Sequence, residues 1–172
     1  SLIFSGQWIA TNGGRGFSGI AMRIIVLLPA TEEELAQVAQ LDPKEDLESL
    51  LRRASRDEKP AVCAAATARL RSDPELLERM AAMLNSGDAE LALSFVRDAE
   101  LTPAEKARFA RPALNALGRW VNSAPAPNFT TSEHMRRVRR WGDELFRVLP
   151  EKFAGTGVDF SEQQAWYEEK MK

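Results

Sequence analysis

The stretch DEKPAVCAAATARLRSDPELLERMAAMLNSGDAELALSFV, residues 57–96, decides the fold class because it holds successive runs of helix-forming residues separated by short polar breaks. Apolar residues recur at helical spacing within these runs, for example Leu76, Met80, Met83 and Leu84. The run 61–70 is rich in alanine, so it carries little side-chain volume and can lie close to neighbouring helices. A lone helix pair cannot bury its apolar face. The stretch therefore predicts helices that pair and cover one another.

Similar helix-start signals recur on both sides of this stretch, namely DPKE at 42–45, DPEL at 73–76 and TPAE at 102–105. Each places a capping residue before a proline at the first helical position, where the missing N–H costs nothing. A further start, at Thr31, has the acidic residues of a capping box. The near-regular spacing predicts a repeat, whose third unit is kinked or split by Pro112.

The stretch 57–96 resembles HEAT-like repeats, in which paired helices stack into a solenoid. The turn DEKPAV followed by an alanine-rich helix is the most family-like feature. The resemblance covers about residues 42–122 and departs from the family at Cys63, where arginine is common, and in the irregular third unit. It implies a short α-solenoid with a ridged concave surface for a partner. The alternative is an irregular helical bundle, so either way we expect a mostly α fold.

The chain divides into four segments of one domain. We expect an N-terminal extended or β-hairpin segment at 1–30, a paired-helix repeat region at 31–122, a proline-containing loop at 123–131 and C-terminal helices at 132–172. Capping boxes formed by Thr130 with Glu133 and by Ser161 with Gln164 are expected to begin the last two helices, and Gly155 and Gly157 to lie in the loop between them.

The N-terminal segment contains a G-x-G-x-x-G pattern in TNGGRGFSGI, residues 11–20. A dinucleotide-binding loop follows a strand and opens a helix, whereas this one precedes the strand-like run 20–28. It therefore predicts a hairpin turn. The apolar run 20–30 is shorter than the roughly 20 residues of a bilayer-spanning helix. Because the chain begins with Ser1 and not with Met, the sequence leaves open whether a membrane anchor precedes it.

No catalytic or metal-binding set stands out. The chain has one cysteine, Cys63, and one histidine, His134, which excludes an intramolecular disulfide and a zinc site of the usual composition. His134 has no nucleophile or acid patterned beside it, and a thiol in an alanine-rich helix is typical of inert core. We predict that the protein is not an enzyme and has no catalytic residue, cofactor or metal. The tryptophans are expected to anchor helices to one another: Trp8, Trp120, Trp141 and Trp166.

The strongest binding candidate is the helix expected at 131–149, TSEHMRRVRRWGDELFRVL. On a helical wheel one side carries five arginines: Arg136, Arg137, Arg139, Arg140 and Arg147. Guanidinium groups bind carboxylates and phosphates, so this face is a candidate for an anionic ligand or a partner. Asp143 and Glu144 stand four residues after Arg139 and Arg140, which predicts ion pairs that partly cancel the field. No Phe or Tyr stands among the arginines to stack bases.

Three functional expectations follow. The first is a non-catalytic protein–protein interaction or scaffold module built of stacked helices, with another protein as partner. The second is nucleic-acid or phosphate binding through the Arg136–Arg140 face, which the net charge of −2 neither demands nor forbids. The third is a soluble domain of a membrane-associated protein, attached through a missing anchor or the 20–30 segment. The sequence does not determine the cellular compartment, and the cytoplasm is the default expectation.

Overall fold

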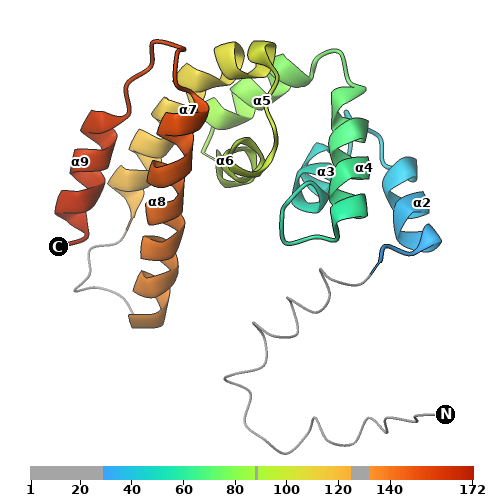
Figure 1. The fold of residues 1–172 in the computed structure, drawn as a ribbon, viewed down its shortest axis with the longest axis horizontal. Coiled ribbons are helices and arrows are strands. Elements are labelled where there is room, and N and C mark those ends of the chain that lie inside the picture. The colour runs from blue at the N-terminus through green and yellow to red at the C-terminus, as the bar shows by residue number, and fades with distance from the viewer. Residues whose placement is uncertain (1–28, 88, 125–131) are drawn as a thin grey trace, which may run out of the picture.

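The computed structural model describes residues 29–87, 89–124 and 132–172. Within these ranges the chain forms α-helices and no strand, which confirms the mostly α fold (Figure 1). The helices are α2 (Glu32–Gln40), α3 (Leu47–Arg53), α4 (Pro60–Arg71), α5 (Leu76–Asn85), α6 (Ala89–Asp98), α7 (Pro103–Ser123), α8 (Ser132–Lys152) and α9 (Ser161–Lys170). The expected hairpin, glycine turn and 20–28 strand lie outside the described residues, as does Thr130.

The helices pack largely on helices two places further along the chain. α2 contacts α4, α5 contacts α7, α6 contacts α8 and α7 contacts α9. α3 joins the two halves of the molecule because it contacts both α4 and α6. The result is a curved row with α2 at one end and α8 and α9 at the other (Figure 1).

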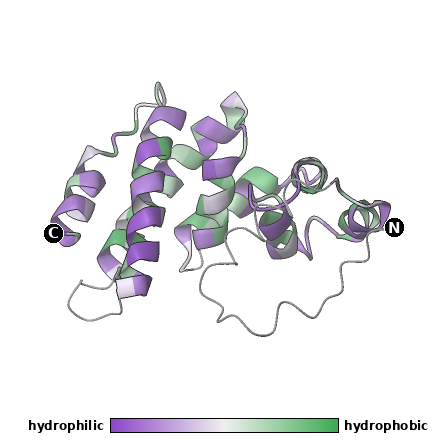
Figure 2. Cartoon of the chain, turned by 60° about the horizontal axis from the view of Figure 1, so that its bottom comes forward, coloured by the Kyte–Doolittle hydropathy of each residue, from purple (hydrophilic) through white to green (hydrophobic). Residues whose placement is uncertain are grey.

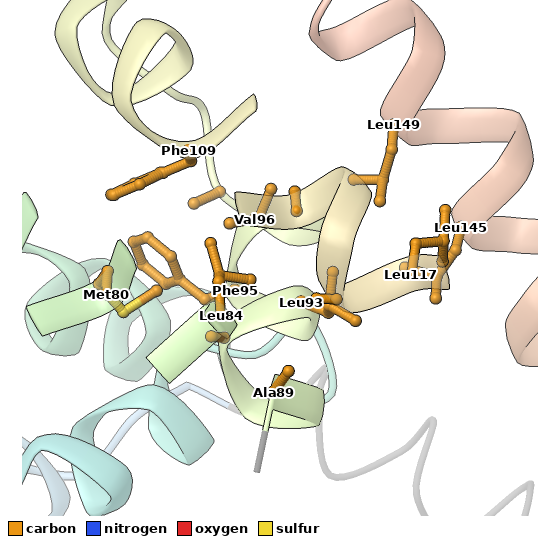
Figure 3. Packing of buried hydrophobic residues seen from close by; sticks show 14 of the residues in the cluster. Met80, Leu84, Ala89, Leu93, Phe95, Val96, Phe109, Leu117, Leu145 and Leu149 are labelled. Atoms are coloured by element: carbon orange, nitrogen blue, oxygen red, sulfur yellow. The ribbon is translucent and has the colours of Figure 1, made fainter. Parts of the chain in front are cut away.

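One hydrophobic core runs through the whole row. It begins at Val38 of α2 and extends to Tyr167 of α9. Figure 3 shows its central part, where Met80 of α5, Phe95 of α6 and Phe109 of α7 contribute large side chains that are fully buried. α8, the long helix next to the C-terminal helix α9, turns a mostly hydrophilic side to the viewer in Figure 2. The helices α5, α6, α7 and α8 are strongly amphipathic, and each buries its apolar side against its neighbours.

Two of the expected helix starts form as predicted. Thr31 Oγ1 accepts a hydrogen bond from the Glu34 backbone N–H, and the Glu34 carboxylate accepts from the Thr31 N–H. Thr102 and Glu105 form the same capping box at the start of α7. These boxes satisfy backbone donors that the first helical turn leaves unpaired.

The DPKE and DPEL signals begin turns that precede the helices, contrary to expectation. Asp42 Oδ1 accepts from the Lys44 backbone N–H at 2.7 Å, and Asp73 Oδ1 accepts from the Glu75 N–H at 3.0 Å. These short side chains bond to the backbone two residues on, which stabilises a turn. The following helices, α3 and α5, therefore begin only at Leu47 and Leu76.

Two other local expectations differ from the structure. Pro112 does not split α7, because buried residues before and after the proline, such as Phe109 and Ala113, hold both halves in the core; a kink at Pro112 stays a prediction. At α9 no side chain caps the helix start, and the Ser161 hydroxyl donates to Asp159 at 2.9 Å. The glycine loop before α9 is confirmed: Gly155 and Gly157 have φ values of 83° and 76°, which favour glycine.

Long basic side chains cap the carboxyl ends of helices in neighbouring positions. Arg69 donates to a carbonyl after α2, Arg119 to carbonyls at the end of α5, Lys152 to the end of α6 and Lys170 to the end of α7. The Lys152 ammonium has three carbonyl oxygens within 3.0 Å. Cations at these ends satisfy free carbonyls and interact favourably with the helix dipole. Part of the basic content therefore serves the fold.

α4 is tied at both ends to a capping box. Before its first turn, Lys59 Nζ lies 2.7 and 2.8 Å from the two carboxylate oxygens of Glu34. At its last turn, Arg71 Nε and Nη2 each lie 2.9 Å from an oxygen of Glu105. The glutamates that start α2 and α7 therefore also attach these helices to α4. None of the helices in the described ranges has the length and apolar content needed to cross a membrane.

Candidate functional site, an arginine-lined hollow

α8 places the five predicted arginines on its solvent side. The helix buries Gly142, Leu145 and Leu149 against the rest of the molecule. The expected apolar partners Met135, Val138, Trp141 and Val148 are half-buried. The opposite side is therefore turned to solvent, and all five arginines on it are exposed: Arg136, Arg137, Arg139, Arg140 and Arg147.

Four of these arginines line an open hollow of about 540 Å³; Arg137 is not among its lining residues. The lining residues are Arg56, Arg136, Arg139, Arg140, Asp143, Glu144 and Arg147. Five guanidinium groups and two carboxylates give this arginine hollow a formal charge of +3. Arg56 comes from the connection between α3 and α4, and no local pattern in the sequence pointed to it.

A closed ring of alternating charges lies beside the hollow. Arg97 Nε is 2.6 Å from Asp98 Oδ1, and Arg97 Nη1 is 3.4 Å from Glu144 Oε2. Arg56 completes the ring, with Nη2 2.6 Å from Glu144 Oε2 and Nε 3.9 Å from Asp98. The side chains of Arg97 and Asp98 are only 7% and 3% exposed. We call these four residues the charge ring.

The charge ring keeps Glu144 ionised. The hydrogen bond from Arg56 lowers the pKa of the Glu144 carboxyl more than partial burial raises it, and Glu144 in turn raises the pKa of the Arg56 guanidinium. Because the ring pairs each charge with an opposite one, it adds no net charge. The positive field of the hollow therefore comes from the remaining arginines, offset only by Asp143.

The ion pairs predicted within α8 do not form as expected. Glu144 bonds to Arg56 and Arg97 instead of Arg140, and Asp143 Oδ1 accepts from the Tyr167 hydroxyl at 2.8 Å. An exposed i,i+4 pair is worth only a few tenths of a kcal/mol, so contacts with the buried side chains of Arg97 and Tyr167 replace it. Within the described ranges no carboxylate lies within 4 Å of Arg136 or Arg140, so both guanidinium groups remain open to a ligand.

An aromatic cluster holds the middle of α8 in place. Trp120 of α7 packs on Trp141 with ring centroids 5.0 Å apart, and Phe146 stacks on Tyr167 of α9 at the same distance. Burial raises the pKa of the Tyr167 hydroxyl, which stays protonated beside the Asp143 carboxylate. Trp120 and Trp141 are the inter-helix anchors that the sequence predicts. Trp166 differs from them because it is 46% exposed, and Trp8 lies outside the described residues.

The two single reactive residues do not line the arginine hollow. Cys63 is half-buried in α4, where burial raises the pKa of the thiol. His134 is half-buried in the first turn of α8. Among the described residues, no group of three or more His, Cys, Asp and Glu is placed to hold a metal ion. A smaller hollow of about 270 Å³ beside Lys152 has mixed charge, with lining residues Glu100, Leu101, Lys106, Val148, Glu151 and Lys152.

The arginine hollow can bind an anion, but the described residues bring no nucleophile and base together in it. Comparison of the chain with protein-family models, with curated proteins and with solved structures finds no match.

Proposed function

We propose that this chain is a non-catalytic binding module that docks an acidic segment of a partner protein in the arginine hollow. The observation that carries the proposal is the pair Arg136 and Arg140, which are exposed, one helical turn apart and without a carboxylate partner in the described part of the chain. Guanidinium groups bind carboxylates bidentately. The row of helices, which we interpret as a short HEAT-like array, supplies a rigid frame for this surface.

Nucleic-acid or phosphate binding is the second candidate function, and two features favour a protein segment over it. The hollow contains the carboxylate of Asp143, which repels a continuously charged backbone. No aromatic side chain lines the hollow to stack a base. A protein segment can place its acidic residues opposite arginines and avoid Asp143. Membrane attachment through residues 20–30 would rest on a segment that lies largely outside the described residues.

Charge reversal at the two open arginines tests the proposal. The double variant Arg136→Glu, Arg140→Glu should weaken binding of a fluorescently labelled poly-aspartate-containing peptide about tenfold or more, because two favourable contacts become repulsive. Fluorescence anisotropy at two salt concentrations measures this, with single-stranded and duplex DNA of matched length as competing probes. Thermal unfolding should be unchanged, because neither side chain has a partner among the described residues.

The matched control is Arg52→Glu, Arg111→Glu, which makes the same charge change at two exposed arginines that do not line the hollow. It should bind the peptide within about twofold of the unmodified protein. Equal losses in both double variants would mean that only net charge matters. Tight binding of DNA without binding of the peptide would replace the proposal with the second candidate.

A further inference from the structure

We infer that the arginine hollow selects segments whose acidic residues form two groups separated by uncharged residues. This inference rests on the proposed function and names the charge pattern of the partner. The arginines of the hollow are divided in two along α8. We call Arg136, Arg139 and Arg140 the first basic group, and Arg147 with Arg56 the second basic group.

The separation of the two groups follows from helix geometry. Arg147 stands seven residues after Arg140 and eleven after Arg136. With a rise of about 1.5 Å per residue, their backbone positions are about 10 to 16 Å apart along the axis. Because the two groups are separated along α8, a ligand that contacts all of these arginines at once is served better by two negative sites than by one.

Asp143 stands between the two groups and its carboxylate has no basic partner within 4 Å among the described residues. The Tyr167 hydroxyl, 2.8 Å away, fixes the Asp143 side chain. An acidic ligand residue at the middle of the hollow therefore meets a fixed like charge. Glu144 does not add to this repulsion because the charge ring neutralises it.

The second basic group can accept a ligand without breaking the charge ring. Arg147 is 71% exposed and only 3.9 Å from Glu144, a weak contact. Arg56 is oriented by Glu144 and Asp98, yet its side chain is 52% exposed, so part of the guanidinium faces solvent. Orientation by the ring lowers the entropy that a ligand must remove when it binds Arg56.

These distances define the partner segment. An extended chain rises about 3.3 Å per residue, so a span of 10 to 16 Å corresponds to about three to five residues. We therefore expect two acidic pairs joined by three or four uncharged residues. The hollow disfavours a segment with contiguous acidic residues, because the Asp143 carboxylate lies where the centre of that acidic run would bind.

Three labelled peptides of equal length test the inference: one with two aspartate pairs separated by four serines, one with four contiguous aspartates in the centre, and one with asparagines in place of all aspartates. The unmodified protein should bind the separated pattern roughly fivefold more tightly than the contiguous one, the effect of one close like-charge contact in water. The asparagine peptide should not bind. Fluorescence anisotropy measures all three.

Asp143→Asn should remove the preference, because it strengthens binding of the contiguous peptide more than binding of the separated peptide. Asparagine keeps an oxygen that can accept from Tyr167, and circular dichroism during heating checks the fold. Glu45→Gln is the matched control, at an exposed carboxylate that does not line the hollow, and should keep the preference. The inference is overturned if the unmodified protein binds both acidic peptides equally, or if the preference survives in Asp143→Asn.

Failure of the proposed function gives a different result. If neither acidic peptide binds, or if Arg136→Glu, Arg140→Glu binds them as well as the unmodified protein does, the proposed function fails and this inference with it. If both peptides bind equally and the double variant loses both, the proposed function stands and only the spacing rule is overturned.

Discussion

At the residue scale, Gly142 determines how closely α7, α8 and α9 approach. A Cβ atom on Gly142 would lie 2.5 Å from Tyr167 Cε2 and 2.7 Å from Trp120 Cη2. Both atoms belong to rings that are packed on other aromatic rings, so neither can move freely. The glycine is needed here because a helix and two aromatic side chains come together where only a hydrogen atom fits.

We predict that Gly142→Ala lowers the free energy of unfolding by about 1–3 kcal/mol, the usual cost of overpacking a filled core. Urea denaturation followed by circular dichroism measures the change. Gly118→Ala in α7 is the matched control, because its nearest contact would be Gln163 Cγ at an ordinary 3.7 Å. Alanine is the better helix former, so this control should gain up to about 1 kcal/mol. A Gly142→Ala variant as stable as the unmodified protein would contradict the packing argument.

At the scale of elements, the contact between Arg71 and Glu105 attaches α4 to the start of α7. Burial raises the pKa of the Glu105 carboxyl, but hydrogen bonds from Arg71 and the Thr102 backbone lower it further, so the pKa lies below its ordinary value of 4.5. A lowered pKa in the folded state means that folding favours the ionised carboxylate. This stabilisation is complete above about pH 4.5 and is lost as the pH falls through the folded-state pKa.

Glu105→Gln should therefore lower the free energy of unfolding by about 1–3 kcal/mol at pH 7, because it removes hydrogen bonds to a charged, buried group. The difference from the unmodified protein should shrink as the pH falls below about 4.5, where the unmodified protein also loses the ionised carboxylate. Urea titrations between pH 3 and 7 measure both effects. Glu45→Gln, at an exposed position, should change stability by less than about 0.5 kcal/mol. If the stability difference between Glu105→Gln and the unmodified protein did not change with pH, it would not come from the ionised Glu105 carboxylate.

At the scale of the whole molecule, the charge ring connects parts of the row that are far apart in the sequence. Arg97 and Asp98 end α6, Glu144 lies in the middle of α8, and Arg56 lies between α3 and α4. The ring therefore links α8 to the end of α6 and to the connection between α3 and α4. Because these same contacts bring Arg56 to the arginine hollow, the stability of the ring and the shape of the binding surface are linked.

We predict that Arg97→Met costs about 3–5 kcal/mol, because it leaves Asp98 buried with a weaker partner. Backbone amides of α8 and of residues 54–59 should then exchange with deuterium faster, and those of α2 should be affected less. Hydrogen exchange measured by mass spectrometry checks this pattern. Arg147→Met, which loses only an exposed contact of 3.9 Å, should cost less than about 1 kcal/mol. Uniformly faster exchange along the chain would show that the ring does not position α8 specifically.

The sequence by itself determined the helices and two of their starts. The capping box at Thr31 and the N-cap at Thr102 formed as predicted, because their hydrogen bonds involve residues three positions apart. The exposed side of α8 was likewise predictable, since helical periodicity alone separates its arginines from its apolar residues. Local interactions and periodicity do not depend on where other elements lie.

Only the tertiary structure decided which charges meet. Glu144 bonds to Arg56 and Arg97 and not to Arg140, the partner that the sequence predicts. Packing in the core likewise keeps α7 continuous through Pro112. Arg56 entered the hollow although it precedes Glu144 by 88 residues. Such partners are set by packing between distant elements, where partial burial makes each contact stronger than the local pair it replaces. The binding surface therefore belongs to the folded molecule, although most of its arginines could be found in one helix.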